Sequence, residues 1–153
     1  MTESINSILA EASTVFGKTI SVRAHSSRGL TLSKTPLEGG SKATKRDPDV
    51  AVMEPSQIRA GVVKALGDWL FVYCIGELKP INQPLLRKEA FLQVLTSVRQ
   101  LLLDNPDRIS AQAFTCCGGV LTFYHFDSEG FAQSEPYCIF DHPLLFVTHM
   151  GLG

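Results

Sequence analysis

The feature that most constrains the fold is an apolar run in the middle of the chain, Leu-Phe-Val-Tyr-Cys-Ile at residues 70–75. A run of this kind, rich in β-branched and aromatic side chains, is typical of a strand buried on both faces. We expect the strand to extend from Leu70 to Lys79. Because such a strand lies inside a covered sheet, the run favours an α/β (α+β) fold class.

Amphipathic helices are predicted on both sides of this strand in the sequence. The first has apolar residues at three- and four-residue spacing and ends at Gly17. Its stripe consists of Ile5, Ile8, Leu9, Ala12, Val15 and Phe16. The second begins at Pro84 and ends before Asn105-Pro106. Its core stripe consists of Phe91, Leu92, Leu95, Val98, Leu101 and Leu102.

Several shorter strands complete the pattern. The alternation of Ile20, Val22 and Ala24 with polar residues predicts one strand, and the β-branched segment 49–53 predicts another. Residues 56–68 fit either a short helix or an extended hairpin arm.

The last third of the chain begins with a predicted β-hairpin. Its strands are residues 111–117 and 120–126, joined by Gly118-Gly119, which suits the positive φ angles of a tight turn. Another short strand is expected within residues 127–140, and a last helix beginning at residues 143–147.

Length and composition favour one domain over residues 1–153. The chain is 44% hydrophobic and 19% charged, which is enough apolar material for a core at this size. No apolar run approaches the roughly 18 residues of a membrane span, and the N-terminal segment does not have the pattern of a secretion signal. We expect an intracellular protein, nuclear or cytoplasmic, with no membrane partner.

The cysteines and histidines do not have metal-site spacing. Cys74, Cys116, Cys117 and Cys138 include no CxxC pair, and the four histidines are scattered along the chain. We expect reduced core cysteines. The absence of a Gly-x-Ser-x-Gly motif also argues against a Ser-His-Asp hydrolase.

Basic residues gather before Asp49, although the net charge of the chain is −1. They lie largely in a polar segment at about residues 25–47, which we expect to be a flexible basic loop. The seven are Lys18, Arg23, Arg28, Lys34, Lys42, Lys45 and Arg46. A solvated loop and an arm that contacts nucleic-acid phosphates both fit this distribution.

The candidate site is at the end of the long central strand. In a strand, side chains two residues apart share a face, so Glu77 and Lys79 point to the same side and Leu78 to the other. If the strand that begins at Asp49 pairs with this one, two carboxylates lie side by side. Carboxylate oxygens are the ligands that Mg²⁺ prefers, with water and a phosphate oxygen completing the octahedron. The lysine could then stabilise negative charge during phosphodiester hydrolysis.

Two segments carry a family resemblance. Residues 46–50, Arg-Asp-Pro-Asp-Val, followed by residues 74–79, Cys-Ile-Gly-Glu-Leu-Lys, resemble the PD-(D/E)xK nuclease superfamily. In their amino-acid sequence, the two segments resemble the region that precedes the kinase in the fungal-type protein kinase family. The segments 93–108 and 114–130 are similar to that family's long helix and Cys-Gly hairpin, so the resemblance covers roughly residues 45–150.

The resemblance implies a mixed central sheet flanked by helices, with an acidic site at one edge and Mg²⁺ (or Mn²⁺) as cofactor. It implies Asp49 and Glu77 as metal ligands, Lys79 as the catalytic lysine and Gln93 as a further catalytic residue. It also implies a carboxylate on the first helix, for which we expect Glu11, near the interior; Glu3, or no residue, is the alternative. Relatives carry a tyrosine four residues after the glutamine, where this chain has Ser97, so an aromatic substrate contact is in doubt.

The sequence has no glycine-rich nucleotide loop, no His-Arg-Asp and no Asp-Phe-Gly, so we expect no phosphotransfer activity. The chain would be a domain of a longer protein or a stand-alone relative. The leading hypothesis is a metal-dependent nuclease, or a nuclease-derived domain, acting on nucleic acid, with DNA favoured over RNA. The alternative is an inactive pseudo-nuclease that serves as an interaction or homodimerisation module. Trp69, Phe71 and Tyr73 alternate and fit either a base-stacking platform or a packed sheet face, and packing is favoured.

Overall fold

The computed structural model describes residues 1–28, 30–33, 47–61 and 65–152, to which all structural statements refer. Its helices are α1 (Thr2–Phe16), α2 (Pro84–Asp104) and α3 (Pro143–His149). Its strands are β1 (Arg23–Ser26), β2 (Leu30–Ser33), β3 (Val50–Met53), β4 (Ala65–Asp68), β5 (Val72–Lys79), β6 (Ser110–Cys117), β7 (Val120–Asp127), β8 (Gly130–Gln133) and β9 (Tyr137–Cys138). Two short 3-10 turns, η1 (Pro55–Gln57) and η2 (Trp69–Phe71), flank β4 in the sequence.

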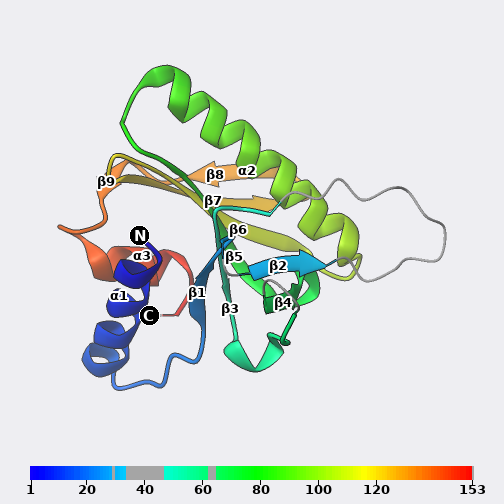
Figure 1. The fold of residues 1–153 in the computed structure, drawn as a ribbon. Coiled ribbons are helices and arrows are strands. Elements are labelled where there is room, and N and C mark those ends of the chain that lie inside the picture. Colours follow the sequence, from blue (N-terminus) through cyan, green and yellow to red (C-terminus); the bar gives the residue numbers. More distant parts are fainter. Residues whose placement is uncertain (29, 34–46, 62–64, 153) are drawn as a thin grey trace.

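A mixed sheet of seven strands forms the centre of the molecule (Figure 1). Its strand order is β1-β3-β5-β6-β7-β8, and β9 also pairs with β7. Neighbouring strands are antiparallel except β5 and β6, which are parallel. Parallel neighbours need a crossover connection, which α2 provides. The expected mixed sheet flanked by helices is confirmed.

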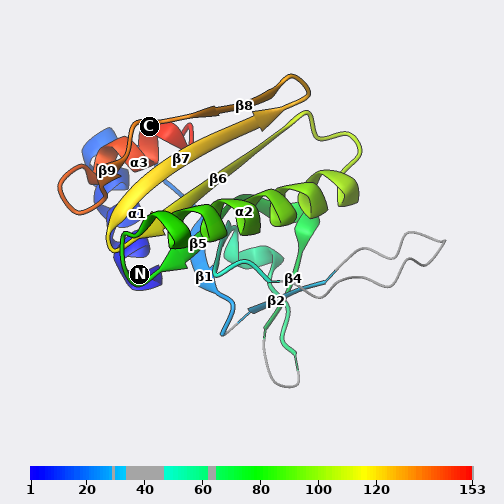
Figure 2. The same cartoon turned by 90° about the horizontal axis from the view of Figure 1, so that it is seen from above.

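Helices cover both faces of the sheet, with α2 on one face and α1 and α3 on the other (Figures 1 and 2). Two hydrophobic clusters result. Ile75 of β5 lies in the cluster on the α2 side with Ala51. Its neighbour Cys74 lies in the cluster on the α1 and α3 side with Val50. Because side chains alternate between the two faces of a strand, Ala51 of β3 and Ile75 of β5 lie on the α2 side of the sheet.

The two long helices follow their predicted bounds, but each apolar stripe is narrower than expected. Gly17 ends α1 with φ 63°, in the left-handed region that favours glycine. Val15 is 57% exposed, so it does not belong to the stripe. In α2, Leu92 is exposed and Ser97 is buried. The core-facing side of α2 is thus rotated from the one that hydrophobicity indicates.

The first part of the predicted central strand is a turn. Residues 69–71 form η2, in which the side chain of Asp68 accepts a hydrogen bond from the backbone N–H of Leu70 at 2.9 Å. Leu70 and Phe71 are exposed, while Trp69 is buried. The expectation of a continuous strand from Leu70 is wrong there, and the alternating aromatic face does not form because the turn breaks the period of two.

The β6–β7 hairpin forms as expected, with φ 58° at Gly118 and φ 84° at Gly119. Strands β8 and β9 provide short pairings after it, and α3 begins at Pro143.

The segment expected to be a flexible loop, residues 25–47, contains a strand. β2 pairs in parallel with β4, and the backbone N–H of Leu32 donates to Asp47 Oδ1 at 3.1 Å. Within residues 56–68, the described residues 65–68 form β4, which is extended but pairs with β2 and not in a hairpin; residues 62–64 lie outside the described residues. Residues 29 and 34–46 of the expected loop lie outside the described residues.

All four cysteines are free, and three of them are buried, as expected for reduced core residues. Among the described helices, none is both long and apolar enough to traverse a bilayer.

Candidate functional site

The structure pairs the two strands that carry the predicted acids. β3 and β5 are antiparallel neighbours, with Val50 opposite Gly76. The next positions along this register are Asp49 and Glu77. Oδ2 of Asp49 accepts a hydrogen bond from the backbone N–H of Leu78 at 2.8 Å, which holds its carboxylate against the end of β5.

The two motif residues of β5 lie on the α2 side of the sheet. Ile75 faces α2, so Glu77 and Lys79, at odd-numbered positions along the same strand, face α2 as well. Asp49 precedes β3 and lies at the end of the sheet. Glu77 is 2% exposed, which is unusual for a carboxylate.

The lysine is held by an acid from the facing helix. Lys79 Nζ lies 2.8 Å from Oε1 of Glu89, with side-chain exposures of 14% and 50%. The same oxygen accepts a hydrogen bond from Nε2 of Gln93 at 3.4 Å. Gln93 thus joins the site through Glu89. Sequence reasoning missed Glu89, although it lies four residues before Gln93 on the same face of the helix.

Ser97, where the resemblance implies a tyrosine, occupies a buried position of α2 and is 2% exposed. Its Oγ has no hydrogen-bond partner in the described part of the chain. The position faces the sheet core and does not present a side chain for base stacking.

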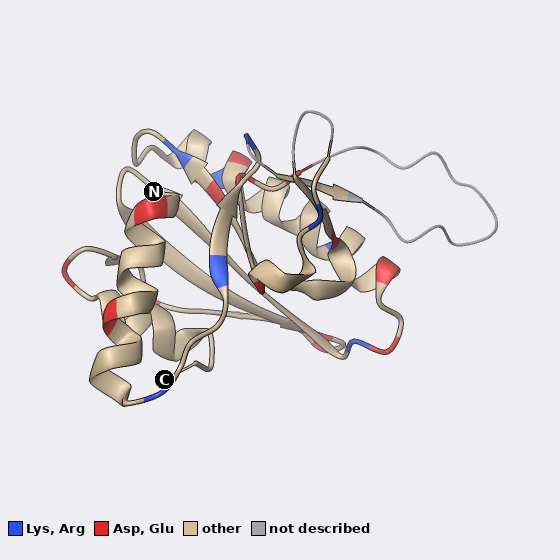
Figure 3. Ribbon diagram, turned by 60° about the horizontal axis from the view of Figure 1, so that its bottom comes forward, with Lys and Arg blue, Asp and Glu red and all other residues tan. Residues whose placement is uncertain are grey.

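Of the two acids of α1, Glu3 and not Glu11 lies at the candidate site. Glu11 lies on the exposed surface of α1, so the expectation that it faces the interior is wrong. Figure 3 shows the two acidic positions of α1 well separated along the helix. Glu3, in the first turn, lines the same pocket as Asp49 and Lys79. The helix turn at Glu3 meets the site because the N-terminal end of α1 abuts this end of the sheet.

An open pocket of about 850 Å³ lies at this end of the sheet. Besides Glu3, Asp49 and Lys79, its wall includes Arg28. Hydroxyl-bearing residues Thr2, Ser26 and Ser27 and the turn glycines Gly118 and Gly119 also line it. Glu77 is not among the lining residues, so of the three motif residues only Asp49 and Lys79 border this pocket.

The donor set offers two carboxylates for a metal ion. Within the described ranges, no group of three or more His, Cys, Asp or Glu side chains gathers as a metal site. A cation held at Asp49 and Glu77 would therefore have few protein ligands and would keep several waters, as Mg²⁺ usually does.

The basic residues before Asp49 do not act as one group in the described part of the chain. Arg23 donates hydrogen bonds to the carbonyls of Ile20 and Val22 at 3.0 and 2.9 Å, which is a structural role. Arg28 is exposed in the pocket wall. The predictions for Lys34, Lys42, Lys45 and Arg46 lie outside the described residues.

The cysteine thiols are poor candidates for nucleophiles. Burial raises the pKa of Cys116 to about 11, and burial raises the pKa of Cys74 further. Both side chains are therefore protonated at neutral pH, whereas the thiolate is the reactive form.

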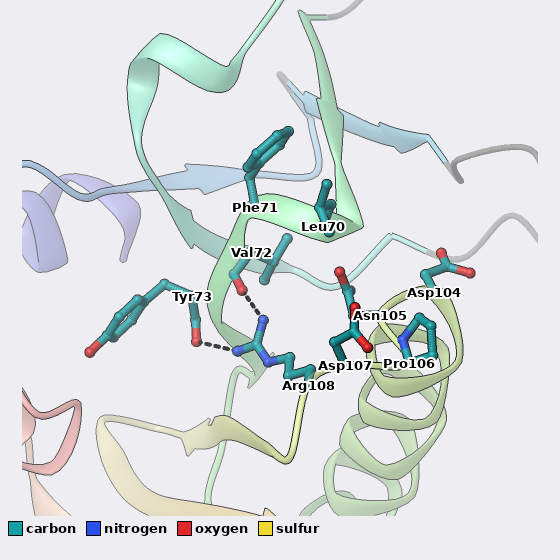
Figure 4. Close-up of a pocket in the computed structure, with 9 residues that line it drawn as sticks. All are labelled: Leu70, Phe71, Val72, Tyr73, Asp104, Asn105, Pro106, Asp107 and Arg108. Atoms are coloured by element: carbon teal, nitrogen blue, oxygen red, sulfur yellow. Dashed lines mark hydrogen bonds between the residues drawn. The ribbon is translucent and has the colours of Figure 1, made fainter.

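A second pocket, of about 530 Å³, lies at the opposite end of β5 (Figure 4). The side chain of Arg108 lines this pocket, but its guanidinium is hydrogen-bonded to backbone carbonyls. Its Nη1 donates to the carbonyl of Val72 and its Nη2 to that of Tyr73, at 2.6 and 3.2 Å, and its Nε donates to Ser110 at 2.8 Å. Three of the five N–H donors of the guanidinium thus connect the start of β5 to β6, which is a structural role.

Comparison with known proteins gives one family match. The model of the fungal protein kinase family matches residues 47–152, which include Asp49, Glu77, Lys79 and the whole of α2. No curated protein matches the chain. The match confirms the fungal-type protein kinase link, and because it spans more than half of the sequence, the chain belongs to the fungal protein kinase family.

Proposed function

We propose that this chain is a metal-dependent nuclease of the PD-(D/E)xK type that hydrolyses phosphodiester bonds of DNA. The observation that carries the proposal is the register of β3 and β5, which, continued by one position, sets Asp49 opposite Glu77 at the end of β5 that also carries Lys79. Two acids and a lysine beside an open pocket can support phosphodiester hydrolysis.

Asp49 and Glu77 would hold Mg²⁺ or Mn²⁺. When bound, the cation supplies a Lewis acid that polarises the phosphate. The hydrogen bond from the backbone of Leu78 fixes one oxygen of Asp49, which leaves its other oxygen for the cation. Burial of Glu77 lowers the local dielectric, which would strengthen the attraction between its carboxylate and the cation.

Lys79 would stabilise the negative charge that develops on the phosphate. Its side chain is only 14% exposed and its ammonium is oriented by Glu89, so little rotamer freedom is lost when it meets the substrate. Gln93 supports the same oxygen of Glu89 from one helical turn further along α2. Glu89 and Gln93 are therefore positioning residues for Lys79.

The family's name does not carry kinase activity to this chain. The matched residues 47–152 contain neither His-Arg-Asp nor Asp-Phe-Gly, which hold the catalytic base and the metal in protein kinases. The proposed nuclease activity depends on Asp49, Glu77 and Lys79, which the chain contains.

A second candidate, an inactive pseudo-nuclease that binds a partner protein, is favoured by the state of two site residues. Glu77 is almost fully buried, and Lys79 is already ion-paired with Glu89. If these contacts keep the site closed, the protein would retain the nuclease fold without hydrolysing phosphodiester bonds.

Cleavage of supercoiled plasmid and of single-stranded DNA in Mg²⁺ or Mn²⁺ distinguishes the nuclease from the pseudo-nuclease. The variants are Asp49→Asn and Glu77→Gln, with Asp141→Asn, an exposed acid far along the chain, as the matched control. We expect metal-dependent cutting by wild type and by the control, a loss of at least about 100-fold in both site variants, and weaker Mg²⁺ binding in calorimetry. Circular dichroism checks that each variant is folded. A folded wild-type protein that neither cuts DNA nor binds metal would leave the pseudo-nuclease.

A further inference from the structure

The pocket beside Asp49 has features that the proposed chemistry does not use. Its volume of about 850 Å³ is in the range of ligand sites, and it extends from the end of β5 to the first turn of α1 and the β1–β2 turn. Two cationic side chains, Arg28 and Lys79, line it, and only Lys79 has a role in the reaction.

Arg28 is held close to the site by the backbone. The residue before it, Ser27, donates its backbone N–H to the carbonyl of Asp49 at 3.2 Å, which continues the β1–β3 ladder by one bond. The turn that carries Arg28 is thus fixed to the residue that carries a proposed metal ligand. The side chain of Arg28 is exposed, in contrast to Arg23, whose guanidinium is committed to backbone carbonyls.

We infer that Arg28 and the hydroxyls around it bind a DNA phosphate next to the one that is cleaved. This inference rests on the proposed function and assigns the substrate-binding part of the same pocket. A guanidinium binds phosphate oxygens in a bidentate manner, and hydroxyl groups such as that of Thr2 supply further hydrogen bonds to the backbone. Contacts of this kind position DNA without reading its sequence.

Glu3 opposes this binding. It is an exposed carboxylate in the wall of the same pocket, so it repels the phosphate that Arg28 attracts. Substitutions of Arg28 and Glu3 should therefore change the affinity for DNA in opposite directions. A nonspecific loss of structure would not produce this pair of effects.

Fluorescence anisotropy with a labelled 20-base-pair DNA duplex, in EDTA so that no cleavage occurs, tests the inference. We expect Arg28→Ala to weaken binding about fivefold at low salt and to reduce the slope of log affinity against log salt by about one. We expect Glu3→Gln to strengthen binding about twofold. Arg59→Ala and Glu11→Gln are the matched controls, because both residues are exposed and neither lines the pocket.

The outcomes separate this inference from the proposed function. Arg28-dependent binding by a protein that does not cut DNA would support the binding site and reject the nuclease. Metal-dependent cutting with wild-type affinity in Arg28→Ala would support the nuclease and overturn the binding site. Equal losses in Arg28→Ala and Arg59→Ala would show diffuse charge attraction and overturn the site. An RNA duplex of the same sequence that binds more tightly than DNA, with the same Arg28 dependence, would overturn the choice of DNA.

Discussion

Lys79 Nζ on the last residue of β5 lies 2.8 Å from Glu89 Oε1 on the second turn of α2, so the sheet and its crossover helix meet in an ion pair at the candidate site. The pair joins two segments that the sequence separates by the loop before Pro84. It makes the position of the proposed catalytic lysine depend on a residue that the motif does not contain.

Replacing Glu89 with Gln should free the lysine. Gln keeps the shape but removes the charge, so we expect Lys79 to react about twofold to threefold faster with acetic anhydride, because a partly exposed ion pair contributes on the order of 0.2–1 kcal/mol. Peptide mass spectrometry after brief labelling measures the rate. Glu89→Asp should restore part of the protection, and the exposed Glu135→Gln should leave it unchanged. Equal labelling of Lys79 in wild type and Glu89→Gln would show that the pair does not hold the lysine.

Gly76 should not tolerate a side chain. A Cβ at this position would clash with Cζ and Cε2 of Phe114, a fully buried residue on β6. We expect Gly76→Ala to lower the free energy of unfolding by about 1–3 kcal/mol through overpacking. Urea denaturation followed by circular dichroism measures the change.

A second substitution makes the Gly76 prediction specific. Phe114→Leu removes the part of the ring that the new Cβ would meet, so the double variant should lose less stability than the two single variants add up to. Additive losses would mean that the clash with Phe114 is not the cause.

Arg108 should contribute to stability and not to activity. Its guanidinium donates to three backbone carbonyls at the start of β5 and β6, which no other side chain can satisfy in the same way. We expect Arg108→Ala to cost about 2–4 kcal/mol of unfolding free energy, and Arg108→Lys to recover only part of it, because Lys lacks the planar fork. Thermal or urea unfolding measures both. A larger loss of DNA binding than of stability would contradict this structural role.

Mild acid should destabilise the fold through two partly buried histidines, His25 and His149. Burial lowers the pKa of both His25 and His149 from the ordinary 6.5. The unfolded chain therefore binds protons at a higher pH than the folded one, so the free energy of unfolding falls as the pH drops from about 6.5 toward the folded-state pKa values. Protonation at Nδ1 of His149 would also remove its capacity to accept a hydrogen bond from the hydroxyl of Tyr137, 3.2 Å away.

Urea unfolding at pH 7 and pH 5 measures this dependence. We expect the loss of stability between the two pH values to be smaller in His149→Asn and smaller still in the double variant with His25→Asn. A pH dependence that is the same in wild type and in the double variant would assign the acid sensitivity to other groups.

Local patterns predicted the elements where a single physical rule dominates. The hairpin at Gly118-Gly119 follows from the positive φ angles of a tight turn, and the start and end of α2 follow from Pro84 and Asn105-Pro106. The start of β5 was predicted wrongly because Leu70 and Phe71 have strand propensity, whereas Asp68 caps a 3-10 turn that the local hydrophobic pattern does not indicate. β2 was missed because its pairing with β4 connects short segments that are far apart in the sequence.

For the candidate site, the sequence by itself determined that Glu77 and Lys79 share a face, because the period of two in a strand requires it. Only the tertiary structure decided what meets them. The β3–β5 register placed Asp49 beside Glu77, the crossover placed Glu89 against Lys79, and the first turn of α1 brought Glu3 to the pocket in place of Glu11. These relationships depend on how separate elements pack, and packing distances between elements are not encoded by the spacing of residues within any one of them.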